Sequence, residues 1–444
     1  MTTALCGAMV VLSLDPPEVA SVDVVVAGGR VAGLGAAPLE AVRRDYSGHL
    51  IVPGNVCAHH HLYSSLARGM PYSLAPPGDF GEILSRIWWR LDRAHNPESV
   101  QASARRGGLE ALLAGTTTIV DHHASPNFID GSLDVVAAQL EELGVRSVLC
   151  YEVTDRDGLR RAAAGVEENR RFARHQRPLT RGMVGAHASF TMSDDTLAAC
   201  ADAAAAVQAG VHIHVAEDGL DERDSMGRYG KRVAQRLADL GVLTGEGLLA
   251  HCVHVHPDEV RQIDAAGATV VCNPCSNMNN GVGYSPFNLR PGRVALGTDG
   301  IGGDMIRESQ AGYFRARELT LDADPSWPLT RMAESARLAG RVFGEPLLGT
   351  LHVGAPADLC VLDYDPPAPL TEESLAGHWV FGLTSGLVRD VYVAGERVVA
   401  DGRSTRVDQA RAASRDSEAA RALWQRMEEI PPHPYLDNAT PMRS

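Results

Sequence analysis

Short apolar runs that end in polar or glycine-rich positions recur along the chain from residue 50 onward. Eight such runs occur, with helical patterns between them: LIVPGNV (50–56), TTTIVD (116–121), RSVLCYEV (146–153), GMVGAH (182–187), VHIHVAE (211–217), LLAHCV (248–253), ATVVCN (268–273) and RVALGTD (293–299). Strands that alternate with helices form parallel βα units, and eight units can close a barrel. The pattern predicts an α/β fold, a (β/α)8 TIM barrel. A doubly wound open sheet is the alternative that periodicity alone leaves open.

The segments between the runs have helical character. Residues 193–210 begin at a serine, a favoured N-cap, and stop at a glycine, while 165–176 and 230–241 are amphipathic at helical spacing. The connection over residues 57–115 is longer than the others and contains FGEILSRIWWRLDRA. Long insertions at this rim of a barrel commonly shape an active site, so we expect this one to do so.

Both ends of the chain show alternating strand patterns instead, for example SVDVVVAGGRVAGLG and VRDVYVAGERVVADGR. Two β-rich pieces of similar character predict one small β-sandwich, formed from both chain ends beside the barrel. The expected divisions are residues 1–52 with 350–405 for the composite sandwich, 53–349 for the barrel, and 406–444 for a C-terminal helix and tail.

The charge balance narrows the choice of partners. The chain has 444 residues, with 41 basic and 55 acidic side chains and a net charge of −14. This balance disfavours nucleic acid and anionic membranes, so the expected partner is a small-molecule substrate. The eight cysteines form no disulfide framework, the N-terminus has no basic region of a signal peptide, and no apolar run approaches ~20 residues. These features predict a cytoplasmic protein.

Histidine and aspartate gather where several of the predicted strands end. A strand directs alternate side chains to one face, so His59 and His61 converge while His60 points away. A lone strand histidine is usually a core residue, and an aspartate before glycine usually forms a turn. Their joint occurrence at one end of successive strands instead predicts a divalent metal site. The other contributors are His212, His214, Glu217, His251 and Asp299.

Two details refine this metal site. His212 and His214 share a strand face, but His212 lies ~6.6 Å deeper, so His214 is the better ligand. Lys231 is the single lysine of the chain and follows the fifth strand. Barrel hydrolases with two bridged metals commonly place a carbamylated lysine at the end of strand four, where this chain has none. The sequence therefore predicts one metal, bound by three histidines and one aspartate, with an open position for water.

The motifs PGNVCAHHH, HVAE, LAHCV, LGTDG and GTLHVGAPADLCVLD resemble the amidohydrolase superfamily in order and spacing, over essentially the whole chain. Within it the sequence is similar to the mononuclear branch of triazine chlorohydrolases, guanine deaminase and adenosine-type deaminases. Segments such as IWWRLDRA, DHHASP and ALGTDGIGGDM resemble the SsnA-type aminohydrolases most closely.

The resemblance implies hydrolytic deamination of a planar, amino-substituted N-heterocycle, such as a purine, pyrimidine or triazine, and a homodimer or larger homo-oligomer. It implies one divalent metal, Zn²⁺ or alternatively Fe²⁺. Glu217 corresponds to the proton-shuttling acid, and His251 to the histidine that orients the attacking water. Asp299 both binds the metal and accepts a proton from that water. The implied metal ligands are His59, His61, His214 and Asp299.

Contacts to the substrate follow from position. Trp88, beside Trp89 on the long first insertion, is expected to stack on a planar ring, and His187 at the end of the fourth run to hydrogen-bond a ring substituent. Helix packing is the alternative for either tryptophan. An ion pair is the alternative to an anion-binding role for Arg68.

Two other functions remain open at this point. The same machinery suits dechlorination, cyclic amide or imine hydrolysis, or ring opening in a biosynthetic pathway. A non-catalytic, metal-stabilised binding protein is the alternative from another class. The presence of Glu217 and His251 counts against it, because a purely structural metal site needs neither.

Overall fold

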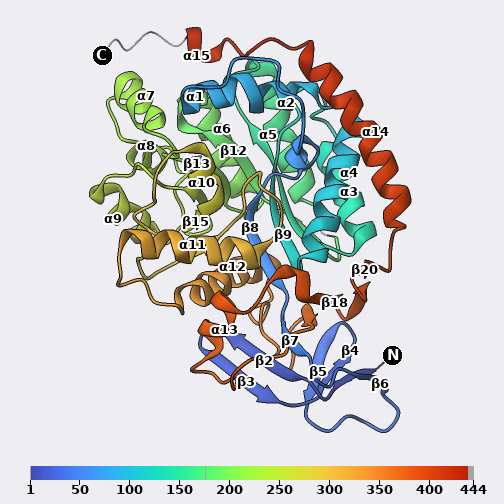
Figure 1. The fold of residues 1–444 in the computed structure, drawn as a ribbon. Coiled ribbons are helices and arrows are strands. Elements are labelled where there is room, and N and C mark those ends of the chain that lie inside the picture. Colours follow the sequence, from blue (N-terminus) through green and yellow to red (C-terminus); the bar gives the residue numbers. More distant parts are fainter. Residues whose placement is uncertain (1, 176, 439–444) are drawn as a thin grey trace.

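Eight parallel strands form a barrel at the centre of the computed structural model, which describes residues 2–175 and 177–438 (Figure 1). A parallel bridge between His60 and Asp299 joins the two outer strands and closes the ring. The (β/α)8 barrel is confirmed, and the open sheet is excluded. The strands are β8 (Asn55–His60), β9 (Thr116–His123), β10 (Arg146–Val153), β12 (Val184–Ala188), β13 (Val211–Val215), β14 (Leu248–His251), β15 (Thr269–Cys272) and β16 (Val294–Leu296).

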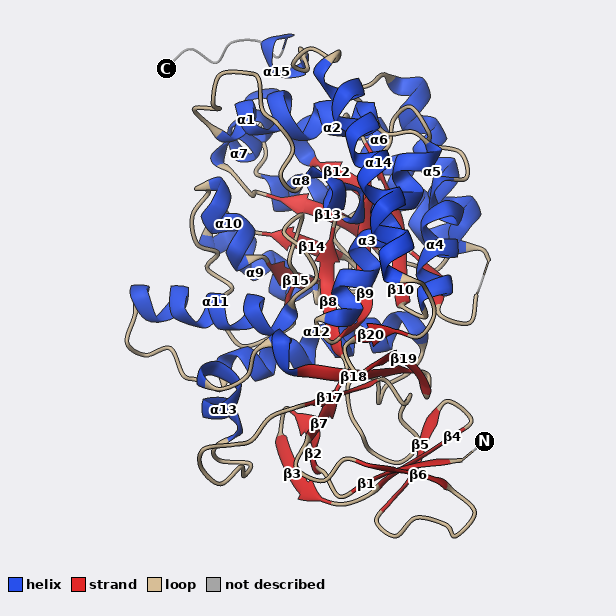
Figure 2. Cartoon of the chain, turned by 45° about the vertical axis from the view of Figure 1, so that its right-hand side comes forward, coloured by secondary structure: helices blue, strands red, loops and turns tan. Residues whose placement is uncertain are grey.

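Helices surround the barrel (Figure 2). The predicted helices at 165–176 and 193–210 overlap α5 and α6. The predicted helix at 230–241 corresponds to α8, which is shorter and begins only at Val233, because Gly230, at φ 65°, ends the preceding helix α7. None of the helices within residues 2–175 and 177–438 is long and apolar enough to cross a membrane. The surrounding helices are α3 (Pro97–Leu113), α4 (Ser132–Leu143), α5 (Leu159–Ala173), α6 (Asp194–Ala206), α7 (Gly219–Tyr229), α8 (Val233–Asp239), α9 (Pro257–Ala266), α10 (Pro274–Asn280), α11 (Met305–Leu319) and α12 (Trp327–Phe343).

The first apolar run divides into two strands, which the sequence treats as one. β7 (Leu50–Pro53) belongs to a sheet outside the barrel, and β8 begins two residues later. Gly54 separates them, and a Cβ at this position would lie 2.3 Å from Oγ1 of Thr117 on β9. Only glycine permits this close approach. The prediction of one barrel strand over 50–56 was wrong because both halves are buried and apolar, so hydrophobicity carries no mark of the division.

Both ends of the chain contribute to a small β-sandwich. A seven-stranded sheet has the order β20-β19-β18-β17-β7-β2-β3, and a four-stranded sheet has the order β5-β4-β1-β6. Apolar side chains such as Val10, Val26, Val361 and Tyr392 share one buried cluster. The strands are β1 (Thr3–Cys6), β2 (Met9–Leu14), β3 (Pro17–Ser21), β4 (Val24–Ala27), β5 (Arg30–Leu34), β6 (Val42–Asp45), β17 (Leu359–Leu362), β18 (Val388–Val393), β19 (Glu396–Ala400) and β20 (Arg403–Ser404).

The sandwich supports the amino ends of the barrel strands. Nε of Arg146, at the start of β10, lies 2.7 Å from Oδ2 of Asp358, just before β17, and both residues are buried. The thiol of Cys360 on β17 donates to the carbonyl of Gly115, next to β9. The carboxyl ends of the strands therefore open on the opposite side, where active sites of this fold lie.

The long connection after β8 forms a cap over those carboxyl ends. It contains α1 (Phe80–Ile83), a single π-helical turn (Leu84–Trp88) and α2 (Trp89–Ala94). α14 (Gln409–Glu428) packs against α2 and α3, and the segment that follows, residues 430–436, continues toward the rim (Figure 1). We call this segment the C-terminal strap. The short α13 (Leu375–Phe381) and α15 (Tyr435–Asn438) complete the described helices, and residues 439–444 of the expected tail lie outside the described part.

Candidate active site

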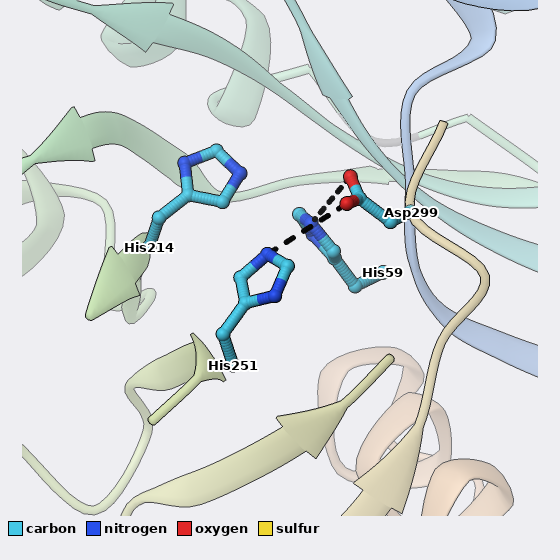
Figure 3. Close-up of side chains that lie close together, drawn as sticks. All are labelled: His59, His214, His251 and Asp299. Carbon is cyan, nitrogen blue, oxygen red and sulfur yellow. Dashed lines mark ion pairs between the residues drawn. The ribbon is translucent and has the colours of Figure 1, made fainter. Parts of the chain in front are cut away.

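The backbone turns sharply where several strands end. His251, at the end of β14, has φ 72°, and Asp299, after β16, has φ 52°. Residues other than glycine rarely occupy this left-handed region, and such strained positions cluster at functional sites. The turns direct the side chains of His251 and Asp299 toward the barrel axis, where they meet His59 from β8 (Figure 3).

His59 and His61 converge as the alternation predicts. Nε2 of His61 lies 3.0 Å and Nε2 of His59 lies 3.5 Å from Oδ1 of Asp299. Nε2 of His214, on β13, lies 3.1 Å from Nε2 of His61. His60 points away, with Nδ1 2.9 Å from Oγ1 of Thr298. The structure thus brings together the four side chains that the sequence predicts as metal ligands.

The outer nitrogens of these imidazoles are held by neighbours. Nδ1 of His61 donates to the carbonyl of His122 at 2.7 Å, and Nδ1 of His214 donates to the carbonyl of His187 at 2.8 Å. Because Nδ1 carries the proton in the neutral ring, Nε2 is left bare and able to bind a metal. Nδ1 of His59 lies 2.8 Å from Nε2 of His212.

The chemistry of the group fits a divalent ion. Burial, reinforced by neighbouring histidines, lowers the pKa of His214 well below its usual value, and burial does the same for His59. Nε2 of His59 and Nε2 of His251 are buried without a hydrogen-bond partner. Ligand atoms of His59, His214, His251 and Asp299 lie within 4.8 Å of one another. Imidazole nitrogens with one carboxylate suit Zn²⁺ or Fe²⁺.

His61 and Asp299 form a buried pair whose groups shift each other's pKa in opposite directions. Burial is the largest single influence on His61 and opposes its charge, but the hydrogen bond to Asp299 together with the charges of Asp299 and Glu152 outweighs burial and raises the pKa of His61 to about 9. For Asp299, burial is opposed by hydrogen bonds from His59 and His61, which together with the charges of His61 and His251 hold its pKa well below the usual value. The carboxylate is therefore ionised and ready to bind a cation.

Glu217 and His251 lie beside the group. Nε2 of His251 lies 3.6 Å from Oε2 of Glu217 and 3.8 Å from Oδ2 of Asp299, while its Nδ1 lies 2.8 Å from Oδ1 of Asn277. His251 comes as near to the centre as the predicted ligands do. Burial raises the pKa of Glu217 to about 7, a value suited to an acid that gives and takes protons at neutral pH.

A cavity of about 810 Å³, its open mouth included, lies over the group. Trp88 and His187, which the sequence predicts as substrate contacts, line it, and Trp89 lines it too. Trp88 is half-buried, whereas Trp89 is fully buried and packs edge-on against His187 with ring centroids 6.1 Å apart. Phe80, Leu84 and Phe190 complete an apolar wall suited to a planar ring.

Several other polar residues lie outside this group. Arg68 forms an ion pair with Glu110 at 2.9 Å, which is the alternative to an anion-binding role. Nε2 of His123 lies 2.9 Å from Oγ of Ser125, away from the cavity. Lys231 pairs with Asp239 at 2.7 Å on the surface, so the one lysine stands outside the site.

Sequence reasoning missed a buried charged cluster at the side of the cavity. Asp92 and Glu152 line the wall, and both pair with Arg156, at 2.6 and 2.9 Å. Ser276, at the start of α10, donates to Oδ2 of Asp299. Glu152 carried a usable signal, since it ends the third strand run as the other site residues end theirs.

Comparisons with known proteins show the family of this chain. Residues 50–398 match the model of the amidohydrolase family. A 5-methylthioadenosine/S-adenosylhomocysteine deaminase of Nitratidesulfovibrio vulgaris is 31% identical over 402 residues, which cover 86% of this chain and 88% of the relative. An 8-oxoguanine deaminase of Pseudomonas aeruginosa is 30% identical over 371 residues, covering 77% and 81%.

Solved structures share the fold. An adenosine deaminase from Xanthomonas campestris with bound zinc has a TM-score of 0.81 at 23% identity, covering 96% of this chain and 99% of that one. The atrazine chlorohydrolase of Arthrobacter aurescens, complexed with zinc, has a TM-score of 0.80 at 21% identity, covering 94% and 100%. With its motifs, its barrel and a family match over most of its length, the chain belongs to the amidohydrolase family.

Proposed function

We propose that this protein is a hydrolytic deaminase of an amino-substituted N-heterocycle that works with one divalent metal ion, Zn²⁺ in preference to Fe²⁺. The observation that carries the proposal is the convergence of bare imidazole nitrogens and one carboxylate beneath an aromatic cavity, with Glu217 alongside. A purely structural metal site would need neither the cavity nor an acid whose pKa lies at about 7.

His59, His61, His214 and Asp299 would hold the metal. When bound, the ion would supply water activation, because coordination lowers the pKa of water from ~15.7 to about 7. The absence of a lysine at the end of β12 favours one ion over a carbamate-bridged pair.

The remaining steps belong to side chains of the chain itself. Oδ2 of Asp299, held by Ser276, accepts a proton from the attacking water, and Nε2 of His251 orients that water. Glu217 gives its proton to a ring nitrogen, then takes the proton of the added hydroxyl group and passes it to the leaving amine. The proton held by Asp299 returns to Glu217, so that water and the amino heterocycle become the oxo heterocycle and ammonia. Trp88 stacks on the ring, and His187 hydrogen-bonds a ring substituent.

The named relatives support deamination as the reaction. Besides the two deaminases above, a 5'-deoxyadenosine deaminase of Methanopyrus kandleri is 27% identical over 384 residues. The cavity, with its planar apolar wall, fits a heterocycle of this kind. We also propose a cytoplasmic enzyme that assembles as a homodimer or larger homo-oligomer; its eight free cysteines suit a reducing compartment.

The test combines metal analysis with an ammonia-release screen of aminopurines, aminopyrimidines and aminotriazines. About one Zn²⁺ or Fe²⁺ per chain is expected, and Asp299→Ala should abolish turnover, whereas Asp304→Ala, which removes the nearby cap of α11, should not. Two tightly bound ions, or an active Asp299→Ala, would overturn the mechanism. Chloride release from a chlorotriazine without ammonia release from any amine would replace deamination by dechlorination.

A further inference from the structure

The cavity over the metal-binding group is rich in carboxylates. Among the described residues of its wall, none is lysine or arginine. Six are acidic: Asp92, Glu152, Glu217, Asp218, Asp221 and Asp299. Two guanidinium groups outside the wall face these carboxylates. Arg156, with 1% of its side chain exposed, pairs with Asp92 and Glu152, and the exposed Arg223 lies 3.8 Å from Asp218. A wall of this kind attracts cations and repels anions.

One carboxylate oxygen of Asp92 has no hydrogen-bond partner. Its Oδ2 lies 2.6 Å from Arg156, but its Oδ1 is buried without a hydrogen-bond partner, although the residue is only 1% exposed. A buried polar atom without a partner is costly, and such atoms in native structures call for an explanation. The ion pair with Arg156 accounts for one oxygen and leaves the other unexplained.

Trp89 presents a matching feature on the same helix. Its Nε1 is also buried without a hydrogen-bond partner, and the residue is 1% exposed. Trp89 and Asp92 are three positions apart on α2, so they share one face, and both line the cavity. The donor of Trp89 and the acceptor of Asp92 are thus both without a partner, on two wall residues that do not belong to the metal-binding group.

The charges around Asp92 favour a cation as its partner. Burial raises the pKa of Asp92 to about 7, and the carboxylates of Glu152 and Asp157 add to this effect against the opposing charge of Arg156. A positively charged N–H group placed against Oδ1 would stabilise the ionised carboxylate and complete its hydrogen bonds.

We propose that Asp92, assisted by Trp89, determines substrate specificity, and that the substrate is an amino heterocycle carrying a second, positively charged N–H group that pairs with Asp92. Heterocycles with a phosphate or carboxylate arm are rejected by the same wall. This inference rests on the proposed function for the reaction, but the charge preference concerns binding and is measurable without turnover.

The first experiment offers each heterocycle in three forms, with a neutral, an aminoalkyl and a carboxyalkyl arm, to the metal-loaded enzyme. Ammonia release gives kcat/KM, and calorimetry gives the dissociation constant. The cationic form should exceed the anionic form by at least ~100-fold, the effect of replacing attraction by repulsion at a partly buried carboxylate.

The second experiment uses Asp92→Asn, with Asp157→Asn as the matched control. Asp157 lies 3.6 Å from the same guanidinium but is absent from the cavity wall. Asp92→Asn should raise KM for the cationic form ~10–100-fold with kcat little changed, and Asp157→Asn should leave KM unchanged. Trp89→Phe, which keeps an aromatic ring without the N–H group, provides a second variant should Asp92→Asn fail to fold.

The outcomes separate the two proposals. Cation-selective binding without ammonia release would retain the inference and reject deamination. Ammonia release with equal or better use of anionic forms would reject the inference and retain deamination. Equal effects of Asp92→Asn and Asp157→Asn on KM would make Asp92 a support for Arg156 alone and overturn its role in specificity, as would a panel in which no cationic form binds.

Discussion

Nε2 of His212 lies 2.8 Å from Nδ1 of His59, with both side chains fully buried. His212 lies two residues before His214 on β13, and the two histidines act at different depths. His214 points its Nε2 into the metal-binding group, whereas His212 supports the imidazole of His59 from below. The alternation of side chains along the strand, which puts His212 and His214 on one face, thus places both histidines in the same site.

His212→Ala should lower the affinity for the divalent ion ~10–100-fold, because a ligand histidine loses the partner that fixes its ring. Competition with a chelator measures this affinity. His123→Ala serves as the control, since it removes a buried histidine that contacts Ser125. Equal metal affinity in His212→Ala and the wild type would contradict the supporting role.

Glu217→Gln should reduce kcat ~10²–10⁴-fold while metal content stays unchanged, because the amide keeps the shape of the side chain but carries no transferable proton. Steady-state kinetics together with metal analysis checks this expectation. Loss of the metal from this variant would show that Glu217 helps to bind the ion instead.

Gly297→Ala should destabilise the protein by about 1–3 kcal/mol and disturb the metal site. A Cβ at this position would lie 2.7 Å from the carbonyl oxygen of His59 and 2.6 Å from Oδ1 of Asn273. Urea unfolding measures the change. In Gly377→Ala, a helical control with no atom within 4 Å of the new Cβ, the free energy of unfolding should stay equal or rise.

Arg90→Met should destabilise the cap over the cavity and raise KM, because the guanidinium of Arg90 joins α2 to the last turn of α14 and to the start of the C-terminal strap. It donates to the carbonyls of Ile430 at 2.6 Å and Met427 at 2.7 Å. A loss of about 2–4 kcal/mol is expected for two charge-assisted bonds. Arg421→Met, which removes an exposed arginine of α14 bonded to Ser417, should change neither stability nor KM by a comparable amount.

Glu308 should make the protein less stable as the pH rises from about 4.5 to 7. Burial raises the pKa of this carboxyl to about 7, so in this window the folded state keeps a proton that the unfolded state has lost. The free energy of unfolding should fall by up to ~1.4 kcal/mol per pH unit. Glu308→Gln should remove the contribution of Glu308 and make the slope shallower, and Glu373→Gln, an exposed control, should retain the full slope. Parallel pH profiles for wild type and Glu308→Gln would contradict the assignment.

Much of the fold follows from strand and helix periodicity. The eight apolar runs correspond to the barrel strands, the first of them only through residues 55–56, because buried parallel strands are short and largely apolar. The division at Gly54 could not be predicted, since it depends on the approach of Thr117, a residue distant in sequence. The sequence also leaves open where the C-terminal strap lies, which depends on backbone carbonyls that accept from Arg90.

The candidate site divides in the same way. Residues at strand ends, such as His59 and Asp299, could be brought together from topology alone, although their roles as ligands remain a prediction. Asp92 and Glu152 could not be paired from sequence, because their contact runs through Arg156 and depends on how the cap folds over the rim. Side chains on strands are fixed by the barrel, whereas side chains on long insertions are fixed by tertiary packing.

β7 lies between β2 and β17 in the seven-stranded sheet, and β17 follows β7 only after the whole barrel has been traversed. During synthesis, the apolar edge of β7 therefore stays unpaired on one side until every barrel strand has been made. Pairings between such distant segments are slow to form, and exposed strand edges promote association with other chains. The edge of β7 is therefore open to association with other chains until β17 has been synthesised and pairs with it. Chaperones that shield strand edges should matter most before that point.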